Sequence, residues 1–526
     1  MKDWLLPRVF VPGVSTAVLL WLSLPGGGEL WPLLFFALIP FLLALRKSSV
    51  RQAIWLGLWC GLAHYLLLLY WIVIVLGRYG GVPLPLAVGA LFLLASYMAF
   101  YFVVFALVAH RLFHWPRPFF VLLALPALWV GLDWVRSWLL TGLPWMDLGY
   151  GLAGVPWLLQ SADIWGHHGL TWLIVLVNVL LASVIAAKGR KQLPLWGTVL
   201  LIFMLVAAYS SWRWLQLEKQ VAAAETLRVG LVQGNIEQDM KWSPEWQQRT
   251  VDRYVEASRK LAAEQRPDLI IWPEAALPFY PIDHELLAPV QVMGRETGVP
   301  LLTGAPWYEL DYEQEKVHFY NSALLQDTNG FFAQRYDKSH LVPFGEYVPL
   351  RRFLFFLKPL VETIGDFTVG SNAQALACEQ ARIGVLICFE SIFPGLARKQ
   401  VKGGATLLVN LTNDAWYGRS SAPHQNLAMA VLRSVENRRS LVRAANTGIS
   451  AFIDPFGRVG GPSPLFDEWS GVADVALMEE SSFYMQGGYL FAPICLLSGI
   501  VALFMAVFRG GAYSGGSGSR LEIVSR

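Results

Sequence analysis

Charged residues and cysteines are both scarce in this chain of 526 residues. Charged residues make up only 15% of it, against about 25% in soluble globular proteins. Hydrophobic residues make up 55% of the chain. So small a charged fraction excludes an ordinary soluble protein, and the composition indicates a protein that crosses a membrane several times.

Other absences exclude further classes. No basic run is present and the formal net charge is only +3, which argues against nucleic-acid binding. The four cysteines, Cys60, Cys378, Cys388 and Cys495, form no CxxC pair and no cluster with histidine. Neither a disulfide framework nor a zinc site is therefore indicated, and we expect no metal and no cofactor.

Long apolar stretches divide the chain sharply. A helix needs about 20 apolar residues to cross a bilayer. Eight stretches approach that length, at residues 8–25, 29–45, 53–76, 83–109, 118–140, 167–187, 193–212 and 486–508. We predict a bundle of seven transmembrane helices in 1–212, a globular domain in 213–482, and an eighth transmembrane helix with a tail in 483–526.

The distribution of lysine and arginine predicts the orientation of this bundle. Short basic loops stay in the cytoplasm. Basic residues gather in loops 46–52, 110–117 and 188–192, and they are few in the alternate loops 26–28, 77–82 and 141–166. Both termini are therefore expected to be cytoplasmic and the globular domain to lie outside, which in a bacterium means an inner-membrane protein with a periplasmic domain.

Within 213–482, strand-length apolar runs alternate with helical patterns. Strands are expected at 227–235, 268–274, 299–304, 380–387, 405–411, 441–445 and 449–454, with a hairpin over 322–338. Helices are expected at 246–265, 284–296, 392–402 and 424–439. Strands separated by helices predict an α/β layered domain, and the hairpin makes its sheet mixed.

Three of these strands end at residues with reactive side chains. Glu274 follows "LIIWP", Lys338 closes the hairpin, and Cys388 follows "IGVLI". Ligands bind at strand ends in open α/β sheets. A carboxylate can take the proton of a thiol, and a cation can stabilise the thiolate or an oxyanion. Each residue also has an ordinary interpretation, because a free cysteine packs like a small hydrophobe and single charges are commonly just solvated.

Several segments together resemble the carbon–nitrogen hydrolase, or nitrilase-like, superfamily: "WPEAALP", "YDKSHLVPFGEYVPLR", "ICFES" and "LTNDAWYGRSSAPHQNLAMA". With apolar spans on both sides of the domain, the chain is similar to the apolipoprotein N-acyltransferase family. "VQGNIEQDMKW" and "VENRRSLVRAANTGIS" also look like segments of that family. The resemblance implies an αββα sandwich carrying a Glu-Lys-Cys triad.

The resemblance also implies a role for each matching residue. Cys388 would be the nucleophile, Glu274 the general base and Lys338 the group that stabilises the oxyanion. Supporting positions are Glu346, Glu390 and Phe389, the last standing where some members have tyrosine. Positions for substrate binding or gating are Trp242, Asn321 and Trp416.

The implied reaction moves a fatty acyl chain from the sn-1 position of a phospholipid, usually phosphatidylethanolamine. The acceptor is the N-terminal amine of the diacylglyceryl-cysteine of an apolipoprotein, and a Cys388 thioester is the intermediate. Membrane lipids are thus partners as well as surroundings. The apolar segment 353–361 would then dip toward the bilayer, or else pack on the domain itself.

Two alternatives stay open at this level. The first is a membrane-bound amidase or nitrilase that passes its thioester to water. The second is a transporter or sensor in which a dead nitrilase-like module only binds a ligand, although the intact triad and the few charges in the spans argue against it. Of those few, Asp133 and Arg136 are expected to pair on one helix face, and His167 and His168 to mark the start of a span without making a metal site.

Overall fold

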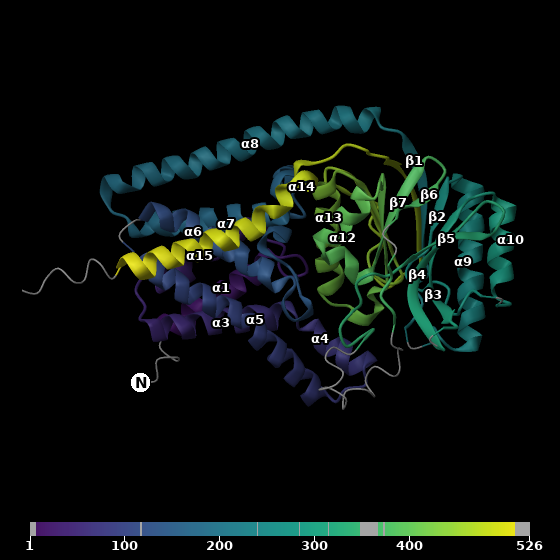
Figure 1. Cartoon of the computed structure of the whole chain (residues 1–526), viewed down its shortest axis with the longest axis horizontal. Coiled ribbons are helices and arrows are strands. Elements are labelled where there is room, and N and C mark those ends of the chain that lie inside the picture. The colour runs from purple at the N-terminus through teal and green to yellow at the C-terminus, as the bar shows by residue number, and fades with distance from the viewer. Residues whose placement is uncertain are drawn as a thin grey trace, which may run out of the picture.

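The computed structural model describes residues 7–510, except 116–117, 239, 283, 314, 348–366 and 372–373. Apolar helices form one half of the molecule and two packed sheets form the other (Figure 1). The expectation for segment 353–361 falls outside the described residues.

The apolar half contains a helix in each of the eight expected stretches. These are α1 (Pro7–Ser23), α2 (Ile39–Leu45), α3 (Val50–Leu68), α5 (Leu84–Phe113), α6 (Pro118–Arg136), α7 (Ala162–Ala186), α8 (Gln192–Ala223) and α15 (Phe491–Gly510). Among the described residues, four helical segments are long and apolar enough to cross a membrane. A fifth is counted if α3 and the bent segment Trp71–Tyr79 form one span. The protein is a membrane protein by this measure, but the prediction of eight membrane-spanning helices is not confirmed.

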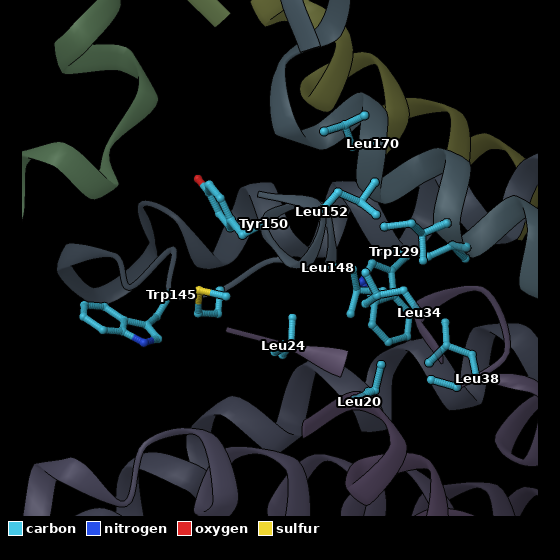
Figure 2. Packing of buried hydrophobic residues seen from close by; sticks show 14 of the residues in the cluster. Leu20, Leu24, Leu34, Leu38, Trp129, Trp145, Leu148, Tyr150, Leu152 and Leu170 are labelled. Atoms are coloured by element: carbon cyan, nitrogen blue, oxygen red, sulfur yellow. The ribbon is translucent and has the colours of Figure 1, made fainter. Parts of the chain in front are cut away.

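The bundle is held together by leucine and aromatic side chains. Leu20 of α1, Leu34 of the 3₁₀ helix η2 (Trp31–Phe35) and Leu170 of α7 converge on this core (Figure 2). Trp129 of α6 joins them from another side. In lipid there is no hydrophobic force between helices, so close packing of such side chains is what holds them together.

The other half is a sandwich of two six-stranded mixed sheets. The first has the strand order β12-β1-β2-β3-β4-β5. Its strands are β1 (Thr226–Gln233), β2 (Leu269–Ile271), β3 (Leu301–Asp311), β4 (Lys316–Gln326), β5 (Phe332–Asp337) and β12 (Trp469–Ala476). The predicted hairpin is present as β4 and β5, whereas the sequence pattern gave no sign of β12 beside β1 or of the long β3–β4 pairing.

The second sheet has the order β11-β10-β9-β8-β7-β6. Its strands are β6 (Leu376–Cys378), β7 (Ala381–Ile387), β8 (Leu407–Thr412), β9 (Ser440–Ala445), β10 (Ala451–Ile453) and β11 (Val459–Gly460). Apolar side chains of both sheets, among them Leu231, Ile271, Val385 and Val409, fill the space between them. Strands β7, β8 and β9 run parallel, which places the ends of β7 and β8 side by side.

Helices cover both outer faces and complete the αββα architecture. Helices α9 (Pro244–Gln265) and α10 (Leu287–Thr297) cover the first sheet, while α12 (Pro394–Lys402) and α13 (Ala422–Asn437) lie between the second sheet and the bundle (Figure 1). One continuous apolar cluster joins Leu432 of α13 to Leu159 in the bundle half. The sandwich is therefore seated on the bundle through α13.

A buried network of charged groups crosses this junction. Arg136 pairs with Asp133 at 3.1 Å, as expected, and also with Asp147. His167 is only 1% exposed, so it does not simply mark the headgroup level. Its two ring nitrogens lie 3.0 Å from Asp147 Oδ2 and 2.9 Å from Glu436 Oε1 of α13. Asp147 and His167 both belong to the bundle half, whereas Glu436 belongs to α13 of the sandwich. The contact between His167 and Glu436 therefore ties the two halves together.

Candidate active site

Glu274 lies three residues beyond the end of β2, where the first sheet meets the second. Its side chain is mostly buried, and the preceding Trp272 is anchored by a hydrogen bond to Ser258 (2.8 Å). Strand β3 passes close behind it at Gly304. A Cβ at position 304 would lie 2.6 Å from the Glu274 Cα, so only glycine permits this approach.

Lys338 follows β5 and points at two carboxylates. Its ammonium lies 2.9 Å from Glu346 Oε1 and 3.8 Å from Glu274 Oε1, and its side chain is 1% exposed. The side-chain amide of Asn321 on β4 donates hydrogen bonds from Nδ2 to both carboxylates, at 2.8 Å to Glu274 Oε1 and 3.0 Å to Glu346 Oε1. Burial disfavours the charged lysine, but the two carboxylates outweigh it and raise the Lys338 pKa. The lysine is therefore a fixed positive charge.

Cys388 sits at the turn where β7 passes into the 3₁₀ helix η9 (Cys388–Ile392). Its φ of +51° lies in the left-handed region, which costs an L-residue about 1 kcal/mol or more. Burial and the nearby Glu274 carboxylate raise the pKa of the thiol to about 12, while the Lys338 ammonium pulls it down. The structure thus brings the three strand-end residues into one buried cluster, in which Glu274 and Lys338 both act on the Cys388 thiol.

This geometry specifies what the thiol needs in order to react. A thiol with so high a pKa is almost wholly protonated at neutral pH, so a neighbouring base must remove its proton as it attacks. Glu274 is a carboxylate that can serve as this base, because its charge acts on the Cys388 thiol and Asn321 holds its side chain at 2.8 Å. The ammonium of Lys338 is also the positive charge available to the oxyanion that forms on a carbonyl oxygen when the sulfur attacks the carbonyl carbon.

Glu390 holds the lysine and cysteine segments together and is itself fully buried. Its carboxylate accepts hydrogen bonds from Ile387 N–H (2.7 Å), just before Cys388, and from Ser339 N–H (2.7 Å), just after Lys338. The Tyr336 hydroxyl donates to it as well, at 2.9 Å. Glu390 is therefore a clamp between two strand ends that are 50 residues apart in the sequence.

Three of the predicted residues remain to be placed in the structure. Phe389 is mostly buried and packs edge-on against Phe393, with ring centroids 5.2 Å apart. Trp242 is 49% exposed, on the segment that precedes α9. Trp416 stacks edge-on against Tyr79 at 5.6 Å, which joins the domain to the bent apolar segment Trp71–Tyr79.

Comparison with known proteins shows the family of this chain. Residues 16–180 match the family model described as apolipoprotein N-acyltransferase N-terminal domain, and residues 228–481 match the carbon–nitrogen hydrolase model. The apolipoprotein N-acyltransferase of Geobacter metallireducens is 43% identical over 95% of this chain and 96% of its own. That of Methylococcus capsulatus is 34% identical over 93% of this chain and 96% of its own. The chain belongs to the apolipoprotein N-acyltransferase family.

Among solved structures, an amidase from Nesterenkonia sp. is 20% identical, with a TM-score of 0.37. The match covers 49% of this chain and 92% of the amidase.

This member of the apolipoprotein N-acyltransferase family carries a second buried lysine that the sequence reasoning missed. Lys241 is 1% exposed and donates to the backbone carbonyl of Glu274 at 3.3 Å. Burial lowers its pKa to about 8, although Glu274 opposes the shift. It lies directly before Trp242, within the "MKW" already noted, but nothing in that pattern distinguishes a buried lysine from a solvated one.

A second missed group supports the turn from the side of β8. Asp414 is fully buried, and its carboxylate accepts from Arg443 at 2.7 Å and from the Thr412 hydroxyl at 3.1 Å. The Thr412 side chain also reaches Cys388 and lowers the pKa of its thiol, against the upward effect of burial. The motif "LTNDAW" contains both Thr412 and Asp414, but their pairing with Arg443 depends on the parallel register of β8 and β9.

Proposed function

We propose that this protein is an apolipoprotein N-acyltransferase that works through a Cys388 thioester. The acyl donor is the sn-1 ester of a phospholipid such as phosphatidylethanolamine. The acceptor is the N-terminal amine of a diacylglyceryl-cysteine. The observation that carries the proposal is the convergence of Glu274, Lys338 and Cys388 in one buried cluster.

In the first half of the reaction, Glu274 takes the proton of Cys388 as the sulfur attacks the ester carbonyl. The negative charge that forms on the carbonyl oxygen is stabilised by the Lys338 ammonium, which Glu346 holds in place at 2.9 Å. When the tetrahedral intermediate collapses, the C–O bond breaks. The departing lysophospholipid oxygen takes the proton back from Glu274, and the acyl chain remains on sulfur.

In the second half, the neutral amine of the acceptor attacks the thioester carbonyl. Glu274 accepts a proton from that nitrogen and passes it to the Cys388 sulfur as the C–S bond breaks, which restores the thiol and the carboxylate. The product is an amide. The acyl group passes from an ester to a thioester and then to an amide, which is the most stable of the three. The reaction is therefore downhill without energy from a nucleotide.

Seating the sandwich on an apolar bundle suits lipid substrates. Exposing an acyl chain to water costs about 0.8 kcal/mol per CH₂. A site that borders the bilayer avoids that cost, and the contact of Trp416 with Tyr79 supports such a border. We further propose that residues 213–482 form a periplasmic catalytic domain between seven transmembrane helices and an eighth, with both termini in the cytoplasm of an inner-membrane protein.

The decisive experiment is intact-mass analysis of the purified protein after incubation with phosphatidylethanolamine alone. We expect one acyl adduct, mapped by peptide analysis to Cys388 and absent from Cys388→Ala. Adding a diacylglyceryl peptide with a free amine should discharge it. Release of free fatty acid without an amine would instead support a hydrolase, and no adduct at all would refute the thioester.

A further inference from the structure

The two adjacent histidines near the start of α7 meet a carboxylate that the sequence did not place beside them. Asp147 directly precedes the 3₁₀ helix η5 (Leu148–Leu152) and lies 20 positions before His167. Nε2 of His167 lies 3.0 Å from Asp147 Oδ2, and Nε2 of His168 lies 3.9 Å from the same oxygen. Two adjacent histidines alone predict no metal site, but the structure adds a third donor to them.

A neutral His167 ring cannot satisfy both of its neighbours. Its Nδ1 lies 2.9 Å from Glu436 Oε1 and its Nε2 lies 3.0 Å from Asp147 Oδ2, so each nitrogen faces a carboxylate oxygen. A neutral imidazole has one N–H and one lone pair, and it can donate to only one of these acceptors. Either the ring is a charged imidazolium at 1% exposure, or a cation lies between Nε2 and Asp147.

His168 provides the observation that favours a metal ion over a second proton. Its Nε2 is buried and has no hydrogen-bond partner among the residues that the structure describes. Buried polar atoms in proteins are nearly always paired, so an unpaired one requires an explanation. The His168 ring lies against the His167 ring, with centroids 3.9 Å apart, and its Nε2 is near the oxygen that His167 also faces. An imidazolium at His167 would leave this nitrogen unpaired, whereas a metal ion would bind it.

The donor atoms are close enough to share one ion. One atom from each of the three residues lies within 4.8 Å of the other two. Bonds from zinc to nitrogen or oxygen are about 2.0–2.2 Å long, so two ligands of one ion lie at most about 4.4 Å apart and this set must close by about half an ångström. Two imidazoles and one carboxylate are ligands that zinc commonly takes. We propose that Asp147, His167 and His168 bind one Zn²⁺ ion.

The groups behind these ligands orient them toward the ion. Metal-binding histidines usually donate their other ring N–H to a carboxylate or a carbonyl. Glu436 accepts from Nδ1 of His167 in this way and also from its backbone N–H at 2.9 Å, which directs Nε2 toward Asp147. Arg136 pairs with Oδ1 of Asp147 and leaves Oδ2 for the ion. Both Glu436 and Arg136 are buried, so this outer shell is part of the packed junction.

The role of this ion is structural. Its three ligands belong to the bundle half, while Glu436 behind His167 belongs to α13 of the sandwich, so the ion strengthens the contact between the two halves. An ion that binds only the folded protein stabilises it. None of the three ligands contacts Glu274, Lys338 or Cys388 within the described residues, so the zinc site goes beyond the proposed acyl transfer and does not depend on it.

Zinc binding by the full chain, purified without a histidine tag and stripped with a chelator, tests the proposal. Titration with Zn²⁺ and elemental analysis should give one tightly bound zinc per chain. His168→Gln removes one ligand but no hydrogen bond among the described residues, so the contacts of His167 remain. We expect this variant to bind zinc at least about tenfold more weakly, since losing even an outer-shell partner has an effect of that size. His424→Gln is the control, because His424 is 41% exposed on α13 and should bind zinc like wild type.

Zinc should also raise the melting temperature of wild type and His424→Gln more than that of His168→Gln, while the three zinc-free proteins melt alike. X-ray absorption at the zinc edge of wild type should show only nitrogen and oxygen ligands at about 2.0–2.2 Å. A sulfur ligand at about 2.3 Å would place the zinc on a cysteine and overturn the proposal. Failure to bind zinc, or equal zinc binding by His168→Gln and wild type, would also overturn it. If His168→Gln does not fold, the absorption spectrum of wild type decides. None of these measurements requires acyl transfer, so they stand apart from the test of the thioester.

Discussion

The clamp formed by Glu390 gives the sharpest test of how this site is held together. In Glu390→Ala, the Ile387 N–H and the Tyr336 hydroxyl lose their carboxylate acceptor inside the core, and the Ser339 N–H loses it near the surface. Leaving a buried donor unsatisfied costs about 1–3 kcal/mol. The Ile387 N–H is left without an acceptor in the core, whereas the Tyr336 hydroxyl keeps the Ser339 hydroxyl at 3.2 Å. Together with the smaller losses at the half-buried Ser339 and His340, this predicts a loss of stability of about 3 kcal/mol.

That loss is measurable as a thermal shift. For a domain of this size, 1 kcal/mol corresponds to about 2–4 °C, so Glu390→Ala should lower the melting temperature by about 6–12 °C. Glu390→Gln keeps one acceptor oxygen, so its melting temperature should lie between those of wild type and Glu390→Ala. Glu468→Gln is the control, because its ion pair with Arg253 (2.9 Å) is 60% exposed on the acid and should contribute less than about 1 kcal/mol.

The clamp should also matter for chemistry, since it holds the turn of Cys388 against the segment that follows Lys338. A misplacement of about 1 Å can cost about a hundredfold in rate. Single-turnover acylation, followed by intact mass at a temperature where Glu390→Ala is folded, should therefore slow by about that factor. A variant that melts and acylates like wild type would refute the clamp.

Three further results are expected. Lys338→Met leaves two buried carboxylates without their ammonium, so single-turnover acylation should fall more than about a hundredfold, and a rate near that of wild type would contradict the role proposed for this lysine. Because burial and Glu274 raise the pKa of the Cys388 thiol to about 12, site-resolved alkylation by iodoacetamide should keep rising from about pH 7 to 11, whereas a plateau near the ordinary thiol pKa of about 8.5 would contradict the environment described. Lys241→Met should melt higher than wild type at neutral pH, since it removes a buried charge. That advantage should shrink above about pH 8. Between about pH 8 and the ordinary lysine pKa of 10.5, Lys241 is neutral in the folded protein but still protonated in the unfolded chain, so the stability of wild type rises with pH across this window. An advantage that does not change with pH would count against a lowered Lys241 pKa.

Much of the fold could be predicted from local patterns. The helix α9 and the strand β7 were placed within a few residues, because amphipathic spacing and short apolar runs are properties of neighbouring residues. The last helix before the domain was placed less well. α8 continues past the predicted end at residue 212 to Ala223, because a helix can extend beyond its apolar stretch wherever its polar face finds partners, as Arg213 does with Asp163.

The sequence by itself determined that the chain is apolar over one half and layered over the other. It also placed a glutamate, a lysine and a cysteine at three strand ends, since run length and strand boundaries are written locally. Only the tertiary structure decided the partners of those residues. Asn321 meets Glu274 across 47 positions and Glu390 meets Tyr336 across 54, and such contacts depend on strand order and register. The burial of Lys241 against the Glu274 carbonyl was decided at the same level, because that contact joins residues 33 positions apart.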